Sequence, residues 1–263
     1  MELTLLTINT WKCDGDYYIR RAVLLKELAA AGAQVILCQE CFQSVDGHTD
    51  TLGFLSAGLG MSAYFLPGRR KERLLGDERV DSFSGLGILT SLPALDHAVI
   101  DLPAVAADGD RKAQLLTLEP LPGHPMLIAN IHLTHLRDEH LRREQLSSLL
   151  DAVRGNNAES RLIGGDWNAE ADSPVLIDAL QPVRALDCYV LGGGGAPRIS
   201  LLASMRNDRP ICVDHFFILP GSGSGQELYP SILRADIVLD KPDATSGLYP
   251  SDHFGIRITM LID

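Results

Sequence analysis

Residues 162–168 read Leu162-Ile163-Gly164-Gly165-Asp166-Trp167-Asn168, a short apolar run that passes through two glycines into a polar end. The run, Leu162–Gly164, is of strand type. Because residues two apart on an extended chain share a face, the side chains of Asp166 and Asn168 can point the same way. The segment therefore predicts a carboxylate and an amide side by side at the end of a strand.

The same arrangement, a polar residue at one end of an apolar run, recurs along the chain. It comprises Asn9 at the end of Leu3–Asn9, Gln39-Glu40 after Val35–Cys38, His132 after Met126–Ile131 with Asn130 on the same face, Asp214 at the start of Val213–Leu219, and Ser251-Asp252-His253 before Phe254–Leu261. If these groups gather at one edge, the strands that begin near Asp214 and His253 run opposite to the earlier ones. We therefore expect mixed sheets rather than all-parallel sheets.

Strand and helix patterns alternate over all 263 residues, and no repeat or linker interrupts them. The helices are expected at Arg20–Ala31, closed by Gly32, and at Asp138–Arg154, ended by Gly155. Further strands are expected at Leu86–Leu89, Leu115–Leu118 and Ile232–Val238. This mixture predicts a single α/β domain, residues 1–263, built on large sheets.

The composition is that of an ordinary globular protein, with 46% hydrophobic and 22% charged residues. The net charge of −11 argues against bulk coating of nucleic acid, whose affinity comes from Lys and Arg, although a local basic patch stays possible. No apolar run reaches the roughly 20 residues of a membrane span, and the first residues lack a secretory pattern. The five scattered cysteines indicate free thiols. We therefore expect a cytoplasmic protein; no protein partner is implied.

The polar groups at the strand ends suit metal-assisted attack of water on a phosphate. Carboxylate and amide oxygens are hard ligands, which favour Mg²⁺ or Mn²⁺ over zinc. An Asp can orient and deprotonate the water, and a His held by a second Asp can donate to the phosphate.

The order of these segments resembles the endonuclease/exonuclease/phosphatase superfamily of DNase I-like metal-dependent phosphohydrolases. The segments that carry the resemblance, which spans essentially the whole chain, are Ile8-Asn9-Thr10-Trp11, Cys38-Gln39-Glu40, residues 85–91 (Gly-Leu-Gly-Ile-Leu-Thr-Ser), Asn130-Ile131-His132-Leu133, residues 165–170 (Gly-Asp-Trp-Asn-Ala-Glu), Val213-Asp214-His215-Phe216-Phe217 and Ser251-Asp252-His253-Phe254-Gly255. The resemblance implies a four-layer α/β/β/α sandwich, in which helices flank two packed mixed β-sheets and the site lies at one rim.

The resemblance also implies a metal site and a substrate site. Glu40 would be the principal Mg²⁺ (or Mn²⁺) ligand, with Asn9 beside it and Asp252 helping. Asn168 would hold the scissile phosphate, and Asn130 is assigned with it to substrate binding.

The same resemblance implies the catalytic roles. Asp166 would position or deprotonate the attacking water. His253, oriented by Asp214, would contact the phosphate oxygens. His132 would stabilise developing charge or assist the leaving group. The predicted function is thus a Mg²⁺- or Mn²⁺-dependent phosphoesterase that acts on a phosphate ester, either a small molecule or a specialised nucleic acid.

The same residues allow other interpretations. Within the superfamily, the alternative is a DNA-processing nuclease or a repair phosphodiesterase. A more remote alternative is a non-catalytic binding module, which would have lost catalytic residues that are intact here.

Cys38-x-x-Cys41 suggests a redox or zinc site, but no second cysteine pair completes the zinc set. The histidines His132, His135 and His140 lack the spacing of a zinc hydrolase. The basic run Arg69–Arg73 is expected to be a solvated loop, or a movable loop that meets a charged substrate. Trp11 stands where some nucleases carry another polar ligand.

Overall fold

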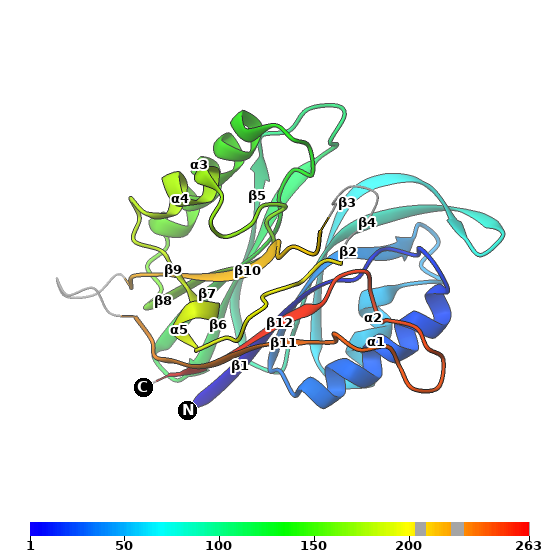
Figure 1. Cartoon of the computed structure of the whole chain (residues 1–263), viewed down its shortest axis with the longest axis horizontal. Helices are drawn as coiled ribbons and strands as arrows, with labels where there is room; N and C mark the ends of the chain where they lie inside the picture. The colour runs from blue at the N-terminus through cyan, green and yellow to red at the C-terminus, as the bar shows by residue number, and fades with distance from the viewer. Residues whose placement is uncertain (203–208, 222–228, 263) are drawn as a thin grey trace.

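Two mixed β-sheets form the centre of the protein, whose computed structural model describes residues 1–202, 209–221 and 229–262 (Figure 1). In spatial order, the first six-stranded sheet contains β11 (Ile232–Val238), β12 (Gly255–Leu261), β1 (Glu2–Asn9), β2 (Val35–Ser44), β4 (Glu78–Thr90) and β3 (Ser62–Leu75). The second contains β5 (Ala94–Leu102), β6 (Arg111–Leu121), β7 (His124–His132), β8 (Ser160–Asp166), β10 (Asp214–Leu219) and β9 (Leu186–Asp187).

The strand directions are mixed, as the sequence predicted. β1 and β2 pair in parallel, and so do β7 and β8. β12 runs antiparallel to β1, and β10 runs antiparallel to β8. The segments around Asp214 and His253 therefore enter their strands at the edge where β1, β2, β7 and β8 end.

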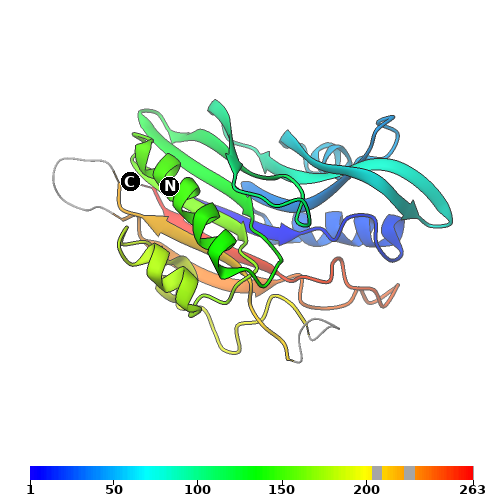
Figure 2. The same ribbon diagram turned by 90° about the horizontal axis from the view of Figure 1, so that it is seen from above.

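Helices cover the outer face of each sheet and complete the four layers (Figures 1 and 2). The helices α1 (Tyr17–Ala31) and α2 (Thr51–Leu59) pack on the first sheet; α3 (Glu139–Gly155) and α4 (Pro174–Leu180) pack on the second. A short helix, α5 (Cys188–Leu191), follows β9. Side chains of both sheets, among them Leu5, Leu37, Ile128 and Phe216, form one buried cluster between them. The predicted α/β/β/α sandwich is confirmed.

Local signals explain the helix ends. Gly32 adopts a left-handed φ of 64°, and its amide donates to the Leu28 carbonyl, which closes α1 where the sequence predicted. Asp138 precedes α3 and its side chain accepts from the Leu141 amide, so this residue is a cap rather than a helical residue. None of the described helices combines the length and apolar character that crossing a membrane requires.

The prediction of a loop at Arg69–Arg73 is wrong, because these residues belong to strand β3. They pair with β4 in a long antiparallel hairpin, and the register runs from Arg69 opposite Ser84 to Arg73 opposite Val80. The pattern misled because most of these residues are exposed, so the strand shows no apolar alternation. Arg73 is nevertheless buried and donates to the carbonyls of Ser82 and Lys71.

Candidate active site

A cavity of about 1610 Å³ opens at the edge of the two sheets where the predicted site residues meet. Of those residues, Asn9, Glu40, His132, Asp166, Asn168, Asp252 and His253 line it, whereas Asn130 and Asp214 do not. The strand register places three residues of the second sheet side by side. His132 on β7 lies opposite Asp166 on β8, and Asp166 lies opposite Asp214 on β10. Seven of the nine predicted site residues therefore lie together at this edge.

Asp166 lies at the end of β8, where it is only 2% exposed. Its Oδ2 accepts from Nδ2 of Asn9 at 3.0 Å, and its Oδ1 accepts from the Asn168 amide at 2.9 Å. Burial, followed by the negative charge of Asp214, raises the pKa of Asp166 to about 7, against the opposing charge of His253. The carboxylate is thus fixed in orientation, and its pKa suits proton transfer near neutral pH.

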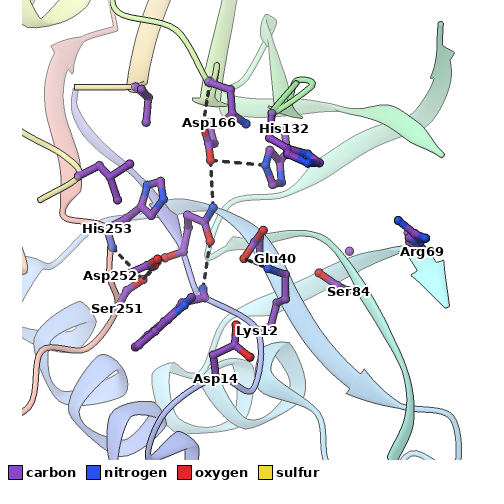
Figure 3. Close-up of a pocket in the computed structure, with 18 of the residues that line it drawn as sticks. Lys12, Asp14, Glu40, Arg69, Ser84, His132, Asp166, Ser251, Asp252 and His253 are labelled. Carbon is purple, nitrogen blue, oxygen red and sulfur yellow. Dashed lines mark hydrogen bonds and ion pairs between the residues drawn. The ribbon is translucent and has the colours of Figure 1, made fainter. Parts of the chain in front are cut away.

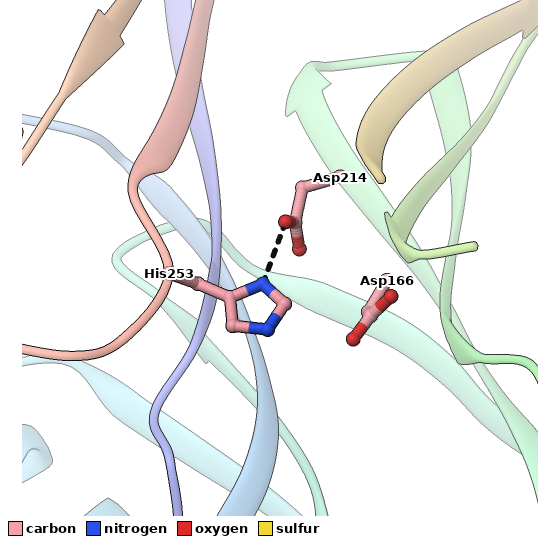
Figure 4. A group of neighbouring side chains, drawn as sticks. All are labelled: Asp166, Asp214 and His253. Carbon is pink, nitrogen blue, oxygen red and sulfur yellow. Dashed lines mark hydrogen bonds and ion pairs between the residues drawn. The ribbon is translucent and has the colours of Figure 1, made fainter. Parts of the chain in front are cut away.

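His253 is paired with the carboxylate of Asp214 (Figure 4). Its Nδ1 lies 2.8 Å from Oδ2 of Asp214, which is fully buried. Burial would lower the pKa of His253, but the charge and hydrogen bond of Asp214, with the charge of Asp166, raise it to about 10. The imidazole is therefore protonated at neutral pH.

Ser200, which the sequence analysis missed, holds Asp214 in place. Its hydroxyl donates to Oδ2 of Asp214 at 2.6 Å and accepts from the amides of Val213 and Asp214. Its carbonyl accepts from the amide of Phe254, next to His253. No pattern in the surrounding residues distinguishes Ser200 from an ordinary loop serine.

His132 ends β7, with Nε2 3.5 Å from Oδ2 of Asp166. Burial, with the charges of Arg111, Lys12 and His253 among the further causes, lowers the pKa of His132 well below its ordinary value, so the ring is neutral. Arg111 donates to the His132 carbonyl and pairs with the buried carboxylate of Asp108. Arg111, at the start of β6, thus links the end of β7 to Asp108 in the preceding loop.

Asn168 takes a left-handed φ of 49°, which turns the chain sharply after β8. Its Nδ2 donates to the Leu133 carbonyl at 3.0 Å. Trp167, between the two polar residues, is fully buried and packs on Phe217, so the turn is anchored in the core. An amide nitrogen carries two hydrogens, and the second can serve a ligand in the cavity.

Glu40 reaches the cavity through a β-bulge in β2. The pairing of β2 with β4 shifts register between Cys38 and Cys41, and Glu40 has a left-handed φ of 55°. Its carboxylate forms an ion pair with Lys12, whose Nζ lies 2.8 Å from Oε2 (Figure 3). The bulge therefore aims a carboxylate at the cavity that regular alternation would not place there.

Oxygen donors suited to a divalent cation surround this part of the cavity. Glu40 and Asp252 offer carboxylates, and Asn9 offers its Oδ1, which accepts one hydrogen bond from the Trp11 amide and retains a second lone pair. Burial, assisted by the charge of Glu40, raises the pKa of Asp252, as expected for two neighbouring carboxylates, and His253 opposes this rise. Such a donor set fits Mg²⁺ or Mn²⁺.

A second group, Asp166, Asp214 and His253, has ligand atoms within 4.8 Å of one another, close enough to hold a metal ion. However, Nδ1 of His253 is already directed at Asp214, and Asp214 does not line the cavity. This geometry suits a hydrogen-bonded Asp–His pair better than a metal site.

The family model for the endonuclease/exonuclease/phosphatase family matches residues 6–253. The chain belongs to this family. Its fold agrees, because solved structures of the family superpose on nearly the whole chain.

One such structure is a family protein from Leptotrichia buccalis, with a TM-score of 0.76 and 16% identity over 99% of this chain and 100% of that one. A humanized TDP2 from D. rerio has a TM-score of 0.74 and 19% identity over 99% of each chain. The mannosyl-6-phosphatase Bt3783 from Bacteroides thetaiotaomicron has a TM-score of 0.74 and 17% identity, over 99% of this chain and 100% of that one. These identities establish a shared fold only. No curated protein matches the chain.

Asn130 does not have the substrate-binding position that the resemblance to the family implied. It is fully buried between the sheets, where Nδ2 donates to the carbonyls of Cys38 and Gly87 and Oδ1 accepts from Gln39. Asn130 shares a face of β7 with His132 but lies two residues farther from the end of the strand. It therefore does not reach the edge of the sheets where the cavity opens. Its amide ties the two sheets together.

The alternative metal and redox sites are not supported. Cys38 and Cys41 are free thiols in the packed core of the first sheet. His135 pairs with Asp108, whereas His140 is exposed on α3 beside Glu144. In the described ranges of the chain, the only group of three or more His, Cys, Asp or Glu side chains with ligand atoms within 4.8 Å of one another is Asp166, Asp214 and His253, which contains no cysteine. Neither alternative site is therefore formed by these residues.

Proposed function

We propose that the protein is a Mg²⁺- or Mn²⁺-dependent phosphoesterase that cleaves its substrate by attack of water. The observation that carries this proposal is the convergence of buried Asp166, the His253–Asp214 pair and the carboxylate of Glu40 on one cavity. The family is one of phosphoester hydrolases, and one similar structure is that of a mannosyl-6-phosphatase.

Asp166 is the base in this proposal. Its two hydrogen bonds, from Asn9 and from the Asn168 amide, fix the plane of the carboxylate, so that it can orient an attacking water. A base whose pKa lies near the working pH combines a useful ionised fraction with a strong drive to take the proton.

The substrate phosphate is held by groups that carry or donate hydrogen. Protonated His253 uses Nδ1 for Asp214, so Nε2 donates to a phosphate oxygen. Asn168 contributes the second hydrogen of its Nδ2. Neutral His132, 3.5 Å from Asp166, faces the same space and stabilises the charge that develops on the leaving group.

Glu40, Asn9 and Asp252 would hold the divalent cation. Bound there, such an ion neutralises charge on the phosphoryl oxygens and on the leaving group. The chain's contribution is to present three hard oxygen donors from separate elements, namely the end of β1, the β2 bulge and the segment before β12.

The substrate is a phosphate ester, either a small molecule or a specialised nucleic acid, and the proposed compartment is the cytoplasm. A nuclease or repair phosphodiesterase is the alternative within the family. The observation that favours it is the exposed basic pair Arg69 and Lys71, which lines the cavity and could meet further phosphates.

The test is a screen of the purified protein with Mg²⁺, with Mn²⁺ and with chelator. The substrates are bis-p-nitrophenyl phosphate, p-nitrophenyl phosphate, plasmid DNA, single-stranded oligonucleotides, inositol phosphates and sphingomyelin. We expect metal-dependent turnover of at least one, reduced about 10²–10⁴-fold by Asp166→Asn. The exposed Asp151→Asn is the matched control. Turnover that survives Asp166→Asn contradicts the mechanism; turnover of no substrate favours a non-catalytic binding module.

A further inference from the structure

Lys12 occupies a position that the proposed function leaves unexplained. Its side chain lines the cavity and its Nζ is 2.8 Å from Oε2 of Glu40 (Figure 3). The side chains of Lys12 and Glu40 are only 30% and 16% exposed, so the pair is partly withdrawn from water. The ammonium therefore sits on the carboxylate that the proposal assigns to a divalent cation.

The backbone that presents Lys12 is strained and firmly held. Trp11 and Lys12 have left-handed φ values of 56° and 44°, a conformation that residues with a Cβ adopt only where the surrounding structure holds them in it. The amide of Lys12 donates to the Glu40 carbonyl at 3.2 Å, which joins this turn to the β2 bulge. Buried Arg20 donates to the carbonyls of Thr10 and Trp11 and stacks on the indole of Trp11 at 4.5 Å.

Such strain collects at this cavity. Of the six non-glycine residues with left-handed φ in the described chain, four line the cavity, namely Trp11, Lys12, Glu40 and Asn168. The turn therefore has a specific consequence, which is to aim one ammonium at Glu40.

The charges around Lys12 make this contact important for metal binding. Glu40 and Asp252 are carboxylates that line the same cavity, and Nζ of Lys12 lies 2.8 Å from Oε2 of Glu40. In the free protein, the ammonium of Lys12 already forms an ion pair with Glu40. A divalent cation that binds Glu40 is therefore repelled by this ammonium, and the repulsion is strong because the space is partly buried.

We propose that Lys12 is an exchangeable counter-ion of Glu40. The ammonium holds the carboxylate in the free protein, gives way when a divalent cation binds, and then contacts an oxygen of the substrate phosphate. This inference rests on the proposed function, because it takes Glu40 as the metal ligand. Its consequence is cooperative binding: the phosphate gives the displaced ammonium a new partner, so phosphate and metal each strengthen binding of the other.

The experiment measures Mn²⁺ binding by the electron paramagnetic resonance signal of free Mn²⁺, with and without phenylphosphonate as a phosphate analogue that is not hydrolysed. It compares the wild type with Lys12→Met, which keeps the length of the side chain and removes the charge. Lys112→Met is the matched control, because Lys112 lines the same cavity but pairs with Asp101. Lys12→Arg keeps the charge, and Glu40→Gln tests the metal ligand itself.

We expect Lys12→Met to bind Mn²⁺ at least about fivefold more tightly than the wild type when phosphonate is absent. Phenylphosphonate should tighten Mn²⁺ binding by the wild type and by Lys12→Arg, and should do so by a smaller factor in Lys12→Met, where only the direct attraction between phosphonate and metal remains. Lys112→Met should behave as the wild type.

Two results would overturn the inference. The first contradicts only the role of Lys12, and the second also contradicts the proposed metal site. If Glu40→Gln weakens Mn²⁺ binding and Lys12→Met leaves it unchanged or weaker, the role of Lys12 is wrong while the proposed metal site stands. If Glu40→Gln binds Mn²⁺ as the wild type does, or neither binds it, the metal site of the proposed function fails and the inference fails with it.

Discussion

The Nδ1 atom of His253 lies 2.8 Å from Oδ2 of Asp214, although 39 positions separate the two residues in the chain. Burial alone would favour the neutral ring, but the carboxylate outweighs it and raises the pKa of His253 to about 10. A histidine whose folded pKa is raised stabilises the fold fully below its unfolded pKa of about 6.5. That contribution is lost as the pH rises through about 10.

Replacing Asp214 with Asn should lower the pKa of His253. The amide preserves the shape but not the charge, so burial acts with less opposition and the pKa of His253 should fall toward its ordinary value or below. A pH titration of the ring nitrogens by ¹H–¹⁵N NMR measures this, with the exposed Asp101→Asn as control. A ring that stays fully protonated in Asp214→Asn at about pH 8 would contradict the assignment.

The pH profile of kcat/KM should be bell-shaped. Asp166 must be ionised to take a proton, and burial together with Asp214 raises its pKa to about 7, so activity should rise through that pH. His253 must be protonated to donate, so activity should fall through about pH 10. Because the charge of Asp214 raises the pKa of His253, Asp214→Asn should move the alkaline limb to lower pH. A profile that is flat across both limbs would rule out this pair of roles.

Ser200→Ala should destabilise the fold and disturb the site. The change removes a donor to Asp214 and leaves the amides of Val213 and Asp214 without their acceptor, all in a fully buried place. Each unsatisfied buried group costs about 1–3 kcal/mol, so we expect a loss of at least that size in urea unfolding. The exposed Ser91→Ala is the control. Equal stability of the two variants would show that Ser200 does not support Asp214.

The sequence predicted the parts of the site that lie at the ends of apolar strands. Glu40, Asp166 and His253 each adjoin such a run, so local pattern and the geometry of a sheet edge were enough to bring them together. Ser200 and Lys12 lie in irregular segments, where no periodicity marks which residue reaches the site. Their placement depends on the tertiary structure: an antiparallel bridge from Leu201 to His253 for one, and a strained turn for the other.

Asn130 shows the opposite error. Alternation placed it correctly on the face of His132, but periodicity does not show depth, and the two-residue step moved it about 7 Å inward along the strand. The hairpin of β3 and β4 was missed for a related reason. Its outer half is held by backbone pairing and exposed polar side chains, so it lacks the apolar signal by which strands are recognised.

The two faces of the hairpin formed by β3 and β4 differ in charge. On one face Arg70 pairs with Asp81 and Glu72 pairs with Arg79, so the charges are neutralised. The alternate residues Arg69 and Lys71 line the cavity, and among the described residues neither forms a salt bridge. The cavity side of β3 is thus a positive row without carboxylate partners.

If the substrate extends beyond the scissile phosphate, Arg69 and Lys71 should bind its further phosphates. The double variant Arg69→Ala/Lys71→Ala should then raise KM for a single-stranded oligonucleotide with little change in kcat, and leave turnover of bis-p-nitrophenyl phosphate unaltered. Losing two phosphate contacts should also reduce the slope of log KM against log salt by about 1.4. Arg79→Ala is the matched control, since Arg79 lies on the same hairpin but outside the cavity lining. An unchanged salt slope, or an equal effect of Arg79→Ala, would show that the row only keeps the hairpin hydrated and that the substrate ends near Asp166.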